Sequence, residues 1–86
     1  MKKEETVKIL RLVQATFPNY FKTDMMMLTA EMWHEAFVYA EIEYKFAHKA
    51  LTQHISESTK PPTVADICRR AKEIEREEFF ANGGRT

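Results

Sequence analysis

Three histidines, His34, His48 and His54, are the side chains of this sequence best suited to hold a metal ion. Glu31 and His34 are three positions apart, as in helical pairs that hold two metals, but that kind of centre needs a second such pair and the sequence has none. His48 and His54 are six positions apart, so they do not share a helical face. We therefore expect no metal ion and no other cofactor.

Cys68 is the single cysteine and the one candidate for nucleophilic catalysis. Arg69 and Arg70 follow it directly, and their charges would favour the reactive thiolate. Helical periodicity nevertheless places Cys68 on a face expected to be buried, which favours a structural thiol. One cysteine cannot form an internal disulfide and no secretory leader opens the sequence, so we expect an intracellular protein.

Whole classes of enzyme are excluded by the glycines, because both of them, Gly83 and Gly84, lie at the far end of the sequence. A phosphate-binding loop, a dinucleotide-binding turn and a nucleophile elbow each need glycines between a strand and a helix. With no motif for a metal, a nucleophile or a cofactor, the sequence predicts a protein that is not an enzyme and that acts by binding.

The charges are balanced, with 13 Lys and Arg residues against 13 Asp and Glu residues. Affinity for phosphates grows with clustered positive charge, and the longest basic cluster here is only Arg69, Arg70 and Lys72. Direct binding to nucleic acid is therefore disfavoured. No apolar run approaches the roughly 20 residues that cross a bilayer, so we expect no membrane insertion.

Length and composition predict one small folded domain over residues 1–86. A hydrophobic share of 44%, with six Phe, three Tyr and one Trp, is typical of a globular protein. A chain of this length has room for one core and only modest net stability.

Prolines and periodicity divide this domain into helical tracts. Apolar residues recur at helical spacing in the first tract, which predicts a helix over about residues 4–16 that ends before Pro18. Residues 24–58 contain no Gly or Pro and are rich in good helix formers. One rod of that length could not fold back on a core, so we expect a bend near Ala40 and Glu41. The apolar residues of the first tract are Val7, Ile9, Leu10, Leu12, Val13 and Phe17, and the two apolar faces of the middle tract are Met32, Ala36, Phe37 and Ala40, then Tyr44, Ala47, Leu51 and Ile55.

The last tract has the clearest helix start. Two prolines impose an extended approach, the Thr63 hydroxyl can cap the helix, and Asp66 places a carboxylate in the first turn. The helix is predicted to end by Asn82 and Gly83 and to bury Ile67, Cys68, Ala71 and Ile74. The three tracts together predict an all-α fold, a small compact bundle of about four helices.

Two groups of residues are candidates for contact with a partner. Four methionines lie close to Trp33, and they either build the core or form a surface that accepts a partner helix. Near the end of the chain, charged residues precede two adjacent phenylalanines, and a small domain has difficulty burying both rings there. The candidate partner-binding residues are Glu73, Arg76, Glu77, Phe79, Phe80, Met25 and Met26.

A family resemblance rests on the segment KPPTVADI at residues 60–67, together with Trp33, the segment EIEY at residues 41–44 and an opening helix that ends in FPNYF. Over about residues 5–70 the chain resembles the bacteriophage loader/inhibitor proteins of the replicative helicase. The resemblance implies a helical N-terminal domain and a tail that contacts the hexameric helicase, beginning here with residues 69–86. It also implies a protein that holds the helicase inactive and hands it to an origin-bound initiator, in the cytoplasm of a bacterial host.

Three functional hypotheses follow. The leading one is a phage or prophage DNA-replication accessory protein that binds and loads or inhibits a hexameric replicative helicase. The first alternative is a small phage DNA-binding or regulatory module, against which the balanced charge argues. The second is a helical dimerisation domain, a homodimer with Trp33, the methionines and Phe79 at its interface.

Overall fold

Four α-helices make up the fold. The computed structural model describes residues 1–83, in which α1 (Lys3–Thr16), the short 3-10 helix η1 (Thr23–Met25), α2 (Met26–Tyr39), α3 (Tyr44–Glu57) and α4 (Val64–Ala81) follow one another. No strand occurs in these residues. The predicted all-α bundle is confirmed. Residues 84–86, which end the predicted 69–86 tail and include Gly84, lie outside the described part.

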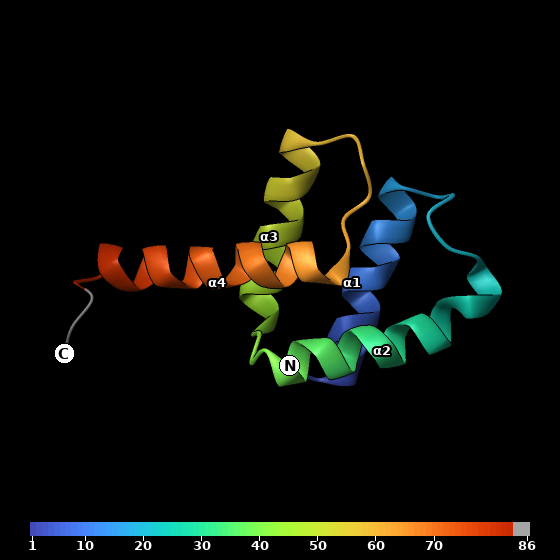
Figure 1. Ribbon diagram of the computed structural model, residues 1–86, viewed down its shortest axis with the longest axis horizontal. Coiled ribbons are helices and arrows are strands. Elements are labelled where there is room, and N and C mark those ends of the chain that lie inside the picture. The colour runs from blue at the N-terminus through green and yellow to red at the C-terminus, as the bar shows by residue number, and fades with distance from the viewer. Residues whose placement is uncertain (84–86) are drawn as a thin grey trace.

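The helices form a bundle from which α4 projects (Figure 1). α3 packs mainly against α4 and α1 mainly against α2, and α1 also contacts α3. α4 crosses α3 and its last turns continue beyond it, so the molecule is extended in one direction and measures 46 × 26 × 16 Å. Within residues 1–83 no helix is both long enough and apolar enough to span a membrane.

One core collects side chains from all four helices. Ile9, Leu10 and Val13 are fully buried on the inner face of α1, where helical spacing brings them together. From α2, the rings of Trp33 and Phe37 meet edge to face with 6.2 Å between their centroids, an arrangement that aromatic pairs favour. The contributions of α3 and α4 to the core are Phe46, Ala47, Ala50, Leu51, Ile67 and Ala71.

The turn between α2 and α3 is the bend expected near Ala40 and Glu41. Glu41 has a φ of 55°, in the left-handed region. Its N–H donates to the Val38 carbonyl at 3.1 Å, and the Ile42 N–H donates to the Phe37 carbonyl at 2.9 Å, which closes the end of α2. This conformation is strained for a residue other than glycine. Burial of Ile42, which is 3% exposed, offsets the strain and explains how the chain bends here without a glycine.

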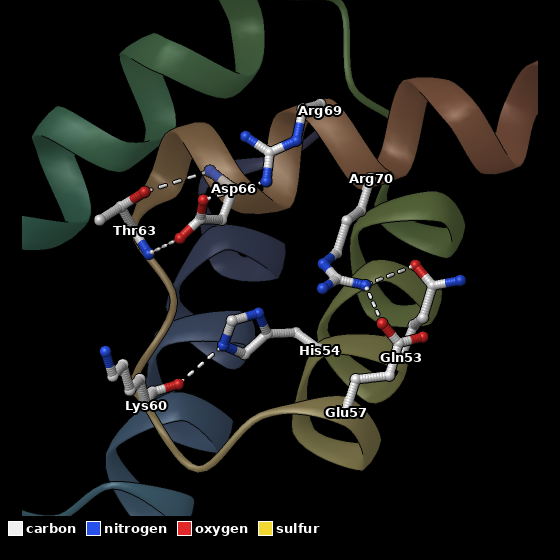
Figure 2. A network of polar contacts seen from close by, with 8 residues as sticks. All are labelled: Gln53, His54, Glu57, Lys60, Thr63, Asp66, Arg69 and Arg70. Carbon is white, nitrogen blue, oxygen red and sulfur yellow. Dashed lines mark hydrogen bonds and ion pairs between the residues drawn. The ribbon is translucent and has the colours of Figure 1, made fainter.

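A capping box begins α4, as predicted (Figure 2). Thr63 Oγ1 accepts a hydrogen bond from the Asp66 N–H at 3.2 Å, and Asp66 Oδ2 accepts one from the Thr63 N–H at 3.0 Å. The hydrogen bond from the Thr63 N–H, with a further contribution from Arg69, holds the pKa of Asp66 below its ordinary value. The carboxylate is therefore charged at neutral pH, where it also interacts favourably with the positive end of the helix dipole.

Polar contacts from α3 fix the direction in which α4 leaves the bundle (Figure 2). The buried His54 donates from Nε2 to the Lys60 carbonyl at 2.7 Å and so holds the loop before the prolines. Arg70 of α4 donates to Gln53 Oε1 at 2.9 Å and to Glu57 Oε1 at 3.1 Å. These contacts position the far end of α4 because the helix between them and its last turn is continuous.

Some predictions of burial are wrong. The predicted apolar face of α2 is not buried as a unit, since Phe37 is fully buried but Met32 is 60% exposed. α2 is apolar on both sides, so its periodicity does not indicate which side is buried. Leu12 and Ile55 are exposed because they lie one position from Val13 and His54, which take the buried places. Half-buried rather than buried are Val7, Phe17, Ala36, Ala40, Tyr44, Cys68 and Ile74.

Candidate partner-binding surfaces

The last turns of α4 carry the first candidate surface. Phe79 and Phe80 are 53% and 66% exposed, and their rings meet edge to face with 5.7 Å between centroids. They line a shallow, open and mainly apolar depression together with Lys72, Glu75 and Arg76. These five residues, Lys72, Glu75, Arg76, Phe79 and Phe80, form what we call the distal α4 surface. Two adjacent exposed rings on a small domain indicate a contact surface.

Sequence reasoning identified part of the distal α4 surface. Arg76, Phe79 and Phe80 were among the predicted partner-binding residues and belong to it, while Glu73 and Glu77 are exposed on the same stretch of helix. Lys72 and Glu75 were missed. Residues 72, 75, 76 and 79 follow the spacing that places residues on one helical face, and this signal could have found them.

Charged contacts attach this end of the helix to the bundle. Lys72 Nζ donates to the Glu41 carbonyl at 3.2 Å and lies 3.5 Å from Glu75 Oε1. Lys49 of α3 pairs with Glu78 of α4. The side chains of both pairs are more than a third exposed, and exposed ion pairs add little stability. They orient the distal turns without burying them.

The methionines are divided between the core and the surface. Met26 is half-buried and packs against the core, whereas Met25 is 44% exposed. Met27 and Met32 are more exposed still, although Trp33 beside them is buried. The start of α2 and the end of α4 lie at opposite ends of the long dimension of the molecule (Figure 1). The structure therefore does not bring the two groups of predicted partner-binding residues together.

The residues first considered for chemistry have structural partners. Glu31 lies 3.6 Å from Lys3 Nζ, and His34 Nδ1 lies 2.9 Å from the Thr6 hydroxyl oxygen, so this pair ties α2 to α1. Within residues 1–83 no three His, Cys, Asp or Glu side chains are grouped as metal ligands. Burial raises the pKa of the Cys68 thiol despite the nearby Lys72, so the thiol is protonated at neutral pH and is a poor nucleophile.

Comparison with known protein families assigns most of this chain. Residues 1–68 match the family of the N-terminal domain of the phage helicase loader/inhibitor. This chain belongs to that family. The match confirms the resemblance carried by KPPTVADI, Trp33 and EIEY. Comparisons with curated proteins and with solved structures gave no match.

The family match ends at Cys68, shortly after α4 begins. It thus includes α1, α2, α3 and the capping box that starts α4. The distal α4 surface lies outside the matched residues. The domain shared with the family consequently supports a helical extension that belongs to the rest of this chain.

Proposed function

We propose that this protein is a phage or prophage DNA-replication accessory protein that binds a hexameric replicative helicase and loads or inhibits it. The observation that carries the proposal is the match of residues 1–68 to the N-terminal domain of the phage helicase loader/inhibitor. Balanced charge argues against direct control through DNA binding. Contact with the helicase itself, without catalysis by this chain, is then the means of control.

The distal α4 surface is the proposed contact with the helicase. Aromatic and arginine side chains are those that most often dominate the free energy of binding, and this surface contains two of the former and one of the latter. Its apolar rings are bordered by both positive and negative side chains, which would orient a partner. Because the surface stands clear of the core, binding there leaves the fold undisturbed (Figure 1).

A second partner completes the proposal. A loader must pass the helicase to a protein already bound at the replication origin, so we include an origin-binding initiator among the partners. Both encounters would take place in the cytoplasm of a bacterial host.

The proposal is tested with purified helicases, one encoded by the host and one by the phage. We expect a complex in size-exclusion chromatography and a changed rate of ATP hydrolysis by the helicase. The double variant Phe79→Ala/Phe80→Ala should bind at least about tenfold more weakly, since truncated hot-spot residues have effects of this size. Leu12→Ala, an exposed position on α1, is the matched control and should bind normally. Failure of both helicases to form a complex or to change in ATPase rate would contradict the proposal.

Two further measurements separate the alternatives. Salt-sensitive binding to an origin-like duplex, followed by fluorescence anisotropy, would favour a DNA-binding module instead. A homodimer in sedimentation that the Phe79→Ala/Phe80→Ala variant dissociates would favour a dimerisation domain.

A further inference from the structure

The outward side of α2 is an apolar helix face with no covering element in the described residues. Its inner side buries Ala30, Trp33 and Phe37 in the core. On the outer side, Met25, Leu28, Met32 and Tyr39 are 44%, 56%, 60% and 91% exposed. We call these four residues, with Glu35 between them, the outer α2 face. A helix that is apolar all round is normally buried all round.

The spacing of the outer α2 face is that of a helix-docking seam. Residues 25, 28, 32, 35 and 39 are separated alternately by three and four positions, which keeps them on one line along the helix. Scattered exposed apolar residues are ordinary on a protein surface, but a continuous line of them at this spacing is the pattern with which helices bind helices. A shallow, mainly apolar depression between Met32 and Tyr39 lies on this side of α2.

Charge identifies the kind of helix that fits there. Residues 23–44 contain no Lys or Arg and five acidic residues, Asp24, Glu31, Glu35, Glu41 and Glu43, although the whole chain is neutral. Glu35 lies in the seam and is exposed, and Glu31 beside it is met by Lys3 at 3.6 Å. A second copy of α2 would place acidic residues against acidic residues and supply no positive charge. A helix with basic flanks would complement this surface.

We propose that the outer α2 face binds an amphipathic helix of a partner protein, with apolar residues on one side and Lys or Arg residues along its edges. Methionine suits this role because its unbranched, polarizable side chain adapts to differently shaped apolar residues. Basic amphipathic helices are recognised on acidic, methionine-rich surfaces by the same combination of contacts. This site is separate from the distal α4 surface, so one protein could hold two partners at once.

A pair of labelled peptides tests the proposal with the intact protein. One peptide of about 18 residues, five helical turns, places Leu on one face and Lys on the other, and its twin has Glu in place of Lys. Fluorescence anisotropy should show binding of the Leu–Lys peptide at least about tenfold tighter than of the Leu–Glu peptide, with the difference reduced by salt. Amide chemical shifts should change mainly along α2.

Matched variants assign the binding to this face. Leu28→Ser/Met32→Ser should weaken Leu–Lys binding at least about tenfold, and Glu35→Lys should weaken it as well. Leu12→Ser and Phe79→Ala/Phe80→Ala are controls that should leave it unchanged, with thermal unfolding confirming that every variant is folded. Equal affinity for the two peptides, or binding unaffected by Leu28→Ser/Met32→Ser, would overturn the proposal.

Two other results bear on the occupant and on the separation from the helicase site. A dimer in sedimentation that Leu28→Ser/Met32→Ser dissociates would show that a second copy covers the face, and this too would overturn the proposal. The effect of the protein on helicase ATPase should survive Leu28→Ser/Met32→Ser. If the peptides fail to bind while the ATPase effect remains, the α2 site alone is refuted, whereas the reverse result refutes only the helicase proposal.

Discussion

The two halves of α4 belong to one continuous helix but are held in different ways. Residues 64–72 begin with a capping box and bury Ile67 and Ala71 in the core. Residues 73–81 have only the half-buried Ile74 and the ion pair of Glu78 with Lys49, and they expose both phenylalanines. One helix can therefore serve as scaffold at its start and as contact surface at its end. Substitutions in the first half should change stability, and those in the second half should change binding.

The largest effect on this comparison is expected from Ile67→Ala. Ile67 is fully buried, so its truncation should lower the free energy of unfolding by about 2–5 kcal/mol. A small domain has only about 5–15 kcal/mol in total, so the variant should be close to unfolding. Urea denaturation followed by circular dichroism measures the change. A loss below about 0.5 kcal/mol, the size expected of a surface substitution, would show that the start of α4 is not packed as described.

The capping box should give the next largest effect. Thr63→Ala removes the hydroxyl that accepts from the Asp66 N–H and should cost about 1 kcal/mol of stability. The same denaturation measurement detects it, with Thr59→Ala, a position outside the cap, as the control.

The Asp66 carboxylate makes the capping contribution depend on pH. Its pKa is lowered in the folded protein, chiefly by the Thr63 N–H, so it stabilises the fold above its ordinary pKa and loses this contribution as pH falls through the folded value. Asp66→Asn should therefore be less stable than the unmodified protein at about pH 7 and nearly equal to it at about pH 2. A stability difference that stays constant over this range would be inconsistent with the capping role.

A smaller effect is expected where the distal half touches the bundle. A double-mutant cycle of Lys49→Ala and Glu78→Ala should give a coupling of about 0.2–1 kcal/mol that falls with added salt, because both side chains are exposed. A coupling well above this range, or one insensitive to salt, would mean that the distal half is attached as firmly as the proximal half and would remove the contrast between them.

The smallest effect on stability should come from the phenylalanines themselves. Phe79→Ala/Phe80→Ala should change the free energy of unfolding by less than about 0.5 kcal/mol per residue, as at other exposed positions. The same variant should have the largest effect on helicase binding. If it unfolds the protein, both rings contribute to the fold and the distal half is scaffold as well.

Local signals in the sequence were enough to place most of the helices. Pro18 ends the first helix, and the pattern of two prolines, Thr63 and Asp66 begins the last one, as observed. Such signals depend on residues within one turn of each other, which is why they survive without knowledge of the fold. The bend at Glu41 was predicted from length, but its mechanism was not, because the strain there is offset by burial of Ile42 in a core built from all four helices.

The candidate surfaces were only partly predictable. Phe79 and Phe80 were recognised as hard to bury, and both are exposed. For the methionines the same reasoning left two interpretations open, since neighbouring positions of an all-apolar helix differ only in the direction they face. The exposed seam through Met32 and Tyr39 became visible only when Trp33 and Phe37 were seen in the core.

The sequence by itself determined the secondary structure, the family and the lack of net charge, because caps, prolines, periodicity and motifs are properties of short segments or of composition. Only the tertiary structure decided which face of α2 is buried and how far α4 projects. Those outcomes depend on contacts between residues far apart in the chain, such as Thr6 with His34 and Arg70 with Gln53. They arise when helices pack, and no single helix contains the information that selects them.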